Sequence, residues 1–149
     1  KITSDDNTEA LYQAVCLNMN PRIESSAPDE LSKTAERFID DSSDSFQKGD
    51  WDKAIEQASQ ALYFNPKSEV AYTNRAGAYA NKGMFKEAEE DSNNAIAINP
   101  NYGLAYNNRG WAYEKLGRYD RAAADFKTGC SLGTQIACNN LNRIMFPGR

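Results

Sequence analysis

The segments Lys48-Gly-Asp-Trp-Asp-Lys-Ala54, Lys82-Gly-Met-Phe-Lys-Glu-Ala88 and Leu116-Gly-Arg-Tyr-Asp-Arg-Ala122 share one pattern. Each holds a glycine, an aromatic residue two positions later and an alanine three positions after that. The pattern returns every 34 residues, from Gly49 to Gly83 and from Gly83 to Gly117. Asn-Pro pairs at 65–66 and 99–100 keep the same spacing. Self-similarity at a fixed period is the signature of a repeat architecture, so the sequence predicts three copies of one structural unit.

Each unit has the features of a helical hairpin. Tyr72 and Tyr79, like Tyr106 and Tyr113, are seven residues apart and therefore share one face of a first helix. The glycine that follows favours the left-handed conformation in which many helices end. A second helix is predicted over about 51–64, 85–98 and 119–131. The Asn-Pro pairs end the first two of these, because the residue before proline resists the helical conformation.

Small residues occupy equivalent positions where the two helices of a hairpin must touch. The first helices carry Ser42, Ala76 and Gly110, and the second helices carry Ala54, Ala88 and Ala122. Small side chains allow the helix axes to approach closely, and a larger residue would overpack the contact. All six positions are predicted to be core.

The period, the glycine–aromatic–alanine segment and the closing Asn-Pro resemble the tetratricopeptide repeat over about residues 35–132. The resemblance implies an all-α fold, a right-handed superhelix of stacked antiparallel hairpins with units at 35–68, 69–102 and 103–132. It also implies a concave face, lined by the first helices, that binds a segment of another protein. The sequence departs from the family at Asp41, Arg75 and Arg109, where leucine is usual, and at Ser45, where tyrosine is usual.

Two flanking segments lie outside these units. Residues 134–146 are predicted to form a capping helix, with Ile136, Leu141, Ile144 and Met145 near one apolar stripe that covers the last hairpin or contacts a second copy. Residues 1–34 are predicted to hold a helix at about 8–19 and a loop. This N-terminal segment is expected to pack on the repeats, or alternatively to dock on a neighbouring molecule.

The composition excludes several classes of function. The chain contains no histidine, which removes Ser-His-Asp and Cys-His catalysis and most histidine-ligated metal sites. It has neither of the glycine-rich phosphate-binding motifs. Its net charge of −4 disfavours nucleic-acid binding, and no apolar run approaches the roughly 20 residues that span a bilayer. We therefore expect no enzymatic activity, no cofactor, no metal, no nucleic acid and no membrane insertion.

Two of the three cysteines, Cys130 and Cys138, flank the turn before the capping helix. Antiparallel packing of the two helices would bring them within disulfide range. Their spacing also resembles the pairing in cysteine-rich relatives of the family, which are often periplasmic or secreted. The alternative is a pair of buried free thiols in a cytoplasmic protein.

The first-helix faces left over from the core are predicted to line the concave groove. They carry Ile39, Ser43, Thr73, Asn74, Gly77, Asn81, Asn107, Asn108, Trp111 and Lys115, and also Phe46 and Leu104. Asparagine amides can donate to and accept from a peptide backbone. Trp111 cannot share the face of Tyr113, two residues away, so it either anchors a partner or packs against the neighbouring first helix.

Some members of the family hold the C-terminal carboxylates of heat-shock chaperones with a clamp of lysines, an arginine and asparagines. The resemblance places Ile39, Ser43, Leu104 and Asn108 where a lysine, an asparagine, the other lysine and the arginine would stand, and only Asn74 fits. We therefore expect the clamp to be absent.

The sequence thus predicts a non-enzymatic protein-interaction module that binds a partner peptide or protein segment in the concave groove. The alternative is a self-assembling scaffold that forms homo-oligomers through its N-terminal segment or its end cap.

Overall fold

The computed structural model describes residues 27–148, and every regular element in this range is an α-helix. The elements are α3 (Ala27–Gln47), α4 (Trp51–Phe64), α5 (Glu69–Asn81), α6 (Phe85–Ile98), α7 (Gly103–Lys115), α8 (Tyr119–Ser131) and α9 (Gln135–Met145). The helix expected at about 8–19 lies outside the described residues. None of the helices in the described range has the length and apolar character needed to cross a membrane.

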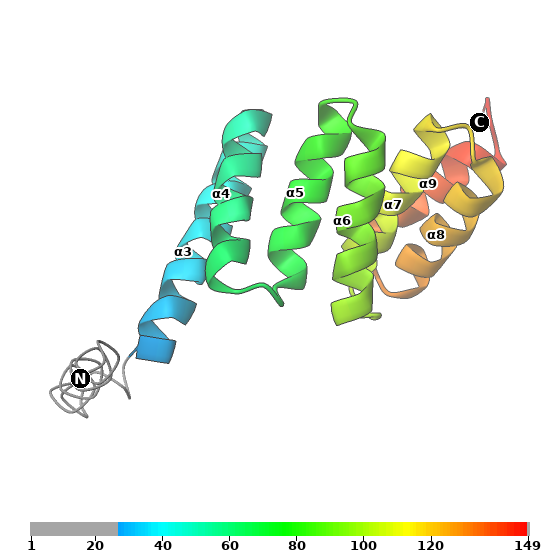
Figure 1. The fold of residues 1–149 in the computed structure, drawn as a ribbon. Helices are drawn as coiled ribbons and strands as arrows, with labels where there is room; N and C mark the ends of the chain where they lie inside the picture. The colour runs from blue at the N-terminus through cyan, green and yellow to red at the C-terminus, as the bar shows by residue number, and fades with distance from the viewer. Residues whose placement is uncertain (1–26, 149) are drawn as a thin grey trace, which may run out of the picture.

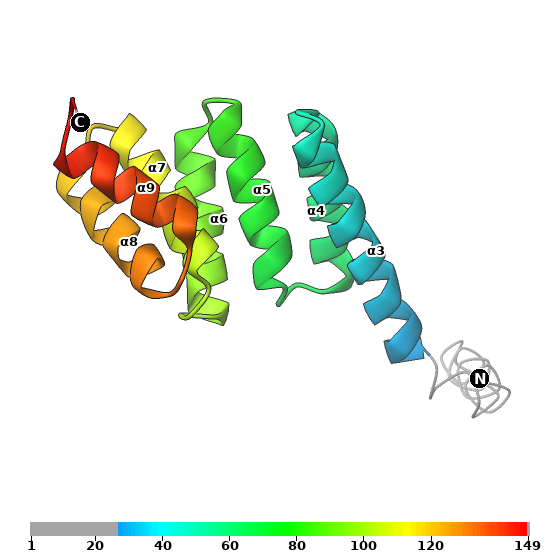
Figure 2. The same cartoon turned by 180° about the vertical axis from the view of Figure 1, so that it is seen from behind.

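The helices form antiparallel hairpins, α3–α4, α5–α6 and α7–α8, followed by α9. Helices adjacent in sequence pack together, and α3 also contacts α5, α5 contacts α7, and α7 contacts α9. As a result α4, α6 and α8 form one side of the molecule (Figure 1), and α3, α5, α7 and α9 form the other (Figure 2). The predicted all-α solenoid of stacked hairpins is confirmed.

Helix α3 begins earlier than the repeat pattern indicated. It starts at Ala27 and therefore includes residues 27–34, which we expected to precede the first unit. Pro28 stands in the first turn, where its missing N–H costs no hydrogen bond. Asp29 and Glu30 are also in that turn, where negative charge favours the helix dipole, and Lys33 Nζ lies 2.8 Å from Asp29 Oδ2.

The turn glycines adopt the conformation that the sequence predicted. Gly49, Gly83 and Gly117 have φ angles of 76°, 79° and 75°, which L-residues with side chains rarely adopt. Gly133, between α8 and α9, has a φ of 87°. The capping helix therefore follows the last repeat through the same kind of turn that joins the helices of a hairpin.

The small residues at the hairpin contacts are buried as predicted. Ala54, Ala88 and Ala122 have no accessible surface, and neither do Ser42 and Ala76. At the third equivalent position, Gly110 leaves room for Phe126, the largest fully buried side chain. An ideal Cβ on Gly110 would lie 2.9 Å from two atoms of the Phe126 ring.

Two ion pairs, each between a partly buried arginine and a buried aspartate, explain the departures from leucine at Arg75 and Arg109. Nε and Nη2 of Arg75 donate to the Asp91 carboxylate at 2.7 and 2.8 Å, and Nη1 donates to Ser59 Oγ at 3.0 Å, which ties α5 to α6 and α4. Arg109 repeats the arrangement one unit later with Asp125, at 2.7 and 2.8 Å. The hydrogen bonds to the aspartates raise the pKa of both guanidinium groups, against the opposing effect of burial.

The capping helix α9 covers the last hairpin with only part of its apolar surface. Leu141 and Ile144 pack against the core cluster that contains Phe126, and Ala137 is buried. Ile136 and Met145 are 52% and 58% exposed, so the four apolar residues do not form the single packed stripe that the sequence indicated.

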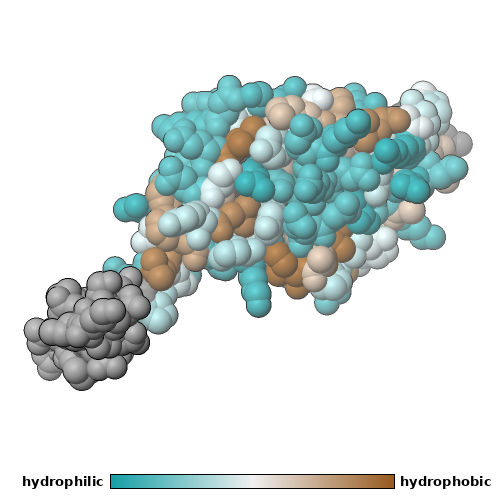
Figure 3. Space-filling model, in the orientation of Figure 1, coloured by the Kyte–Doolittle hydropathy of each residue, from teal (hydrophilic) through white to brown (hydrophobic). Residues whose placement is uncertain are grey.

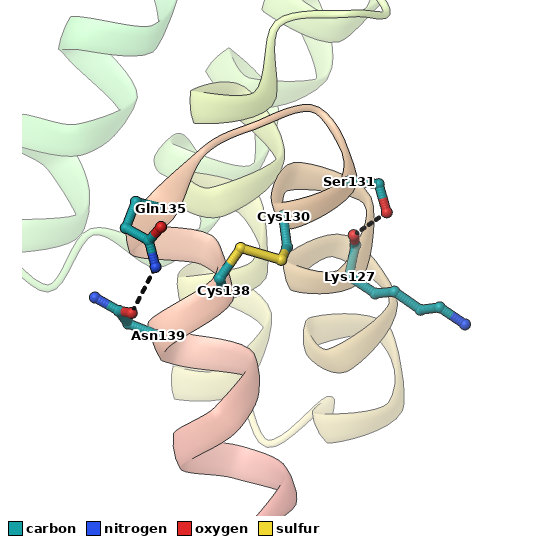
Figure 4. Close-up of a disulfide and its surroundings, with 6 residues drawn as sticks. All are labelled: Lys127, Cys130, Ser131, Gln135, Cys138 and Asn139. Carbon is teal, nitrogen blue, oxygen red and sulfur yellow. Dashed lines mark hydrogen bonds between the residues drawn. A yellow bond between two sulfur atoms is a disulfide. The ribbon is translucent and has the colours of Figure 1, made fainter.

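A disulfide bond joins α8 to α9. It links Cys130 to Cys138, whose Cα atoms are 4.6 Å apart, and thereby resolves the alternative of two free thiols (Figure 4). Both cysteines are half-buried. The bridge fixes the start of the capping helix against the last repeat.

Candidate functional site

A groove runs across the side formed by α3, α5, α7 and α9. It consists of two adjoining hollows of about 280 and 490 Å³, which share Phe46, Gly77, Asn107, Asn108 and Ile136. The remaining lining side chains are Ser43, Gln47, Thr73, Asn74 and Leu104 in the smaller hollow and Asn81, Trp111, Lys115, Asn140 and Arg143 in the larger.

The centre of the groove is apolar. Phe46 of α3, Leu104 of α7 and Ile136 of α9 all line the smaller hollow with Gly77 of α5. Leu104 is 42% and Ile136 52% exposed, although both are large apolar residues. The Phe46 ring is held edge-on against Trp51 of α4, with 5.0 Å between centroids. The three side chains therefore form an apolar surface that the described chain leaves uncovered.

Three asparagines link successive helices along this side. The Nδ2 of Asn74 donates to the Ile39 carbonyl at 3.5 Å, and that of Asn108 donates to the Thr73 carbonyl at 3.0 Å, in each case to the residue 35 positions earlier. Asn140 of α9 donates to Oδ1 of Asn107 at 2.9 Å. We call Asn74, Asn108 and Asn140 the asparagine ladder.

The asparagine amides, which the sequence suggested could bind a peptide backbone, are bonded instead to neighbouring helices. The Nδ2 of Asn74 also donates to Ser43 Oγ at 3.0 Å, and Ser43 Oγ itself donates to the Ile39 carbonyl at 3.0 Å. Thr73 and Asn107 are only 4% and 5% exposed. These polar groups therefore hold neighbouring helices in register.

Charge in the groove is sparse and is concentrated at one end. Lys115 and Arg143 are the charged side chains among the lining residues. Both Nη atoms of Arg143 donate to the Glu114 carboxylate at 2.7 Å, and these bonds lower the pKa of Glu114. No described carboxylate forms a salt bridge with Lys115, although its charge also lowers the pKa of Glu114. This lysine is therefore the groove cation that has no hydrogen-bonded carboxylate partner.

Eleven of the twelve predicted groove residues line the two hollows. The exception is Ile39, which packs against the core cluster of Ala61, Leu62 and Ala71. Among the residues we did not assign to the groove from the sequence, Ile136, Asn140 and Arg143 all come from the capping helix. The available signal was spacing: α8 and the turn after it are each one residue shorter than their counterparts one unit earlier, which places Asn140 32 residues after Asn108 instead of 34.

Trp111 lines the larger hollow and is also part of the core. It packs against the clusters that contain Ala88 and Phe126, and it is half-buried. The packing role considered from the sequence is therefore present, whereas anchoring of a partner stays a prediction. Leu104 and Ile136 are better probes of the groove, since fewer core contacts depend on them.

Comparison with known proteins identifies relatives of the fold. Models of the tetratricopeptide repeat match residues 70–102 and 93–124. No curated protein matches the chain significantly in sequence.

Several solved structures are similar over most of their length. The tetratricopeptide-repeat domain of Arabidopsis OM64 is 30% identical, with 76% of this chain and 96% of that chain covered and a TM-score of 0.71. The first such domain of Spaghetti (RPAP3), bound to the HSP90 peptide SRMEEVD, is 32% identical, with 76% and 92% covered and a TM-score of 0.70. The second such domain of human RPAP3, in complex with the HSP70 peptide SGPTIEEVD, is 28% identical, with 79% and 98% covered and a TM-score of 0.67.

Proposed function

Because the chain belongs to the tetratricopeptide-repeat family, we propose that it is a non-enzymatic interaction module that binds a segment of a partner protein in the groove. The observation that carries the proposal is the uncovered apolar surface of Phe46, Leu104 and Ile136. Burying such a surface against a partner is the main favourable term in most protein associations.

The construction of the groove supports this role. Its side chains come from four helices that the asparagine ladder and the disulfide hold together, so the binding surface exists before a ligand arrives. A preformed surface loses little conformational entropy on binding. Similar domains bind peptides of chaperones, which supports a peptide as the ligand.

Affinity capture with matched variants tests the proposal. Leu104→Asp and Ile136→Asp each place a charge in the groove at an exposed position, so both variants are expected to fold. Tyr119→Asp on α8 is the control, because Tyr119 is 61% exposed and lies outside the groove. We expect a set of captured proteins to be lost with both groove variants and kept with the control. Identical capture profiles for all four proteins would disprove groove binding.

The alternative is self-assembly, and one surface favours it. On the first hairpin Leu31 is 49% and Tyr63 82% exposed. The Tyr63 ring packs edge-on against Phe64, which in turn stacks on Phe38 with 5.9 Å between centroids. Figure 3 shows hydrophobic patches near this N-terminal end, and further ones along the middle and toward the other end of the same largely hydrophilic side. Light scattering over a range of concentrations decides: a mass that stays at one chain throughout removes this alternative.

A further inference from the structure

On the premise that the proposed groove binding is correct, we propose a specific class of ligand. It is an internal, nearly uncharged segment of a partner protein that inserts one large aliphatic or aromatic side chain between Phe46, Leu104 and Ile136. The same segment places a single acidic side chain against Lys115.

The apolar part of the inference rests on the shape of the smaller hollow. Its volume of about 280 Å³ is bounded by side chains of α3, α7 and α9, with Gly77 of α5 among its lining residues. An added Cβ on Gly77 would lie 3.0 Å from Phe46 Cε2 and 3.3 Å from Asn108 Nδ2. The glycine thus keeps this side of the hollow open. The hollow accommodates one or two side chains and is too small for a folded ligand.

The charge of the groove argues against an acidic chain terminus. The Nδ2 atoms of Asn74 and Asn108 are already bonded to neighbouring helices, and Arg143 is paired with Glu114. A carboxylate that leaves water without a partner loses much of its solvation free energy. A terminal carboxylate with further acidic side chains would find one unpaired cation, Lys115.

The two arginines nearest the ladder do not change this balance. Arg75 and Arg109 each follow a ladder asparagine in sequence, but their guanidinium groups point to the second helices and are neutralised by Asp91 and Asp125. They add no available positive charge to the groove. A ligand with one acidic residue therefore matches the single positive charge of Lys115.

Peptide selection against the whole chain tests the inference. One library displays random 12-residue segments inside a carrier protein, and the other displays them at a free C-terminus. We expect the internal library to yield segments with one large apolar residue and one Asp or Glu. A selected segment, synthesised with both ends capped, should bind in calorimetry. Replacing its large apolar residue with alanine, or using the Leu104→Asp variant, should weaken binding about tenfold or more.

Charge reversal tests the acidic position. The Lys115→Glu variant should bind the capped peptide more weakly than the unchanged protein does. Its affinity should return when the acidic residue of the peptide is replaced with lysine. The Tyr119→Asp variant should bind like the unchanged protein. If the peptide binds both Lys115 forms equally, the assignment of Lys115 is overturned.

A second arm separates this inference from the proposed function. The peptide SRMEEVD is compared with its C-terminal amide, and we expect neither to bind measurably. If selection yields only acidic free C-termini, or if SRMEEVD binds and its amide does not, the inference is overturned while groove binding stands. If neither library yields a segment that binds the Leu104→Asp variant more weakly than the unchanged protein, groove binding itself is overturned.

Discussion

Gly110 and Phe126 form one packing unit, since a Cβ on the glycine would lie 2.9 Å from the ring of the phenylalanine. The equivalent pairs in the other hairpins are Ser42 with Ala58 and Ala76 with Ser92. Each residue lies 34 positions before its counterpart in the next hairpin. The third hairpin therefore combines a glycine with the largest fully buried side chain of the described residues, whereas each of the other hairpins combines two small residues.

Replacing Gly110 with alanine should therefore destabilise the protein. Overpacking of a filled core costs about 1–3 kcal/mol, of which the better helix propensity of alanine returns up to about 1 kcal/mol. Urea denaturation measures the difference. In a Phe126→Leu background the same change should cost much less, because the smaller side chain gives way. Equal costs in the two backgrounds would contradict the pairing.

Ser42→Ala should stabilise the protein. The Oγ atom of Ser42 is buried without a hydrogen-bond partner, and a buried unsatisfied hydroxyl costs about 1–3 kcal/mol. The neighbouring Ser43→Ala is the matched control with the opposite sign, since Ser43 Oγ is an acceptor for Asn74. Thermal unfolding of both variants checks the pair, and a lower melting temperature for Ser42→Ala would contradict the prediction.

Removing one member of the Arg109–Asp125 ion pair should be costly. Asp125→Ala leaves Arg109 without its carboxylate, and because Arg109 keeps 20% of its side chain exposed the cost should be about 2 kcal/mol, below that of a fully buried pair. Arg109→Leu in addition restores the residue that is usual in the family, and should recover most of the loss. The double-mutant cycle is measured by urea denaturation. Additive effects of the two substitutions would show that the pair does not act as a unit.

Loss of the disulfide should loosen the capping helix. Cys130→Ala/Cys138→Ala should lower the free energy of unfolding by about 2–3 kcal/mol in the chain-entropy model, because the closed loop is short. Binding of a groove ligand should weaken as well, since α9 supplies Ile136 and Asn140.

Thiol titration checks the bridge directly. Of the three cysteines, one should react before reduction and three afterwards. Three reactive thiols without reductant would contradict the disulfide. Because disulfides persist in oxidising compartments, one reactive thiol before reduction would favour a periplasmic or secreted location, and three would favour a cytoplasmic one.

Acid should weaken the contact between α7 and α9. Arg143 lowers the pKa of Glu114, so their pairing stabilises the folded state above the ordinary glutamate pKa and is lost as the pH falls through the depressed one. The effect is modest because Arg143 is 55% exposed. Stability measured from pH 5 to pH 3 should fall less steeply for Glu114→Gln than for the unchanged protein. Parallel curves would contradict a role for this pair.

The 34-residue period was sufficient to predict most of the fold, because a repeated pattern indicates the hairpins and turns before any tertiary contact is known. The period also placed Asn74 and Asn108 on the groove side. It failed at both ends of the array. Helix α3 extends through residues 27–34 on local helix-start signals that have no counterpart in the other units.

At the other end, α8 and the turn after it are each one residue shorter than their counterparts one unit earlier. This shifts the register of α9 by two residues and obscured the contribution of Ile136 and Asn140 to the groove. The hydrogen bonds that the asparagines make to neighbouring helices could also not be predicted from the sequence. Residue type shows what an amide can bond, but the bond it makes depends on how closely the next helix approaches.

The asparagine ladder makes the molecule extensible. Asn74 and Asn108 each bond the residue 35 positions earlier, so the donor and acceptor for a further interface are both contained in residues 69–102. A tandem duplication of that segment would supply its own rung and its own Arg–Asp pair. Such a lengthened protein is expected to keep its cap and to present a groove one hairpin longer, so the reach of its binding surface can change by whole units without redesign of any contact.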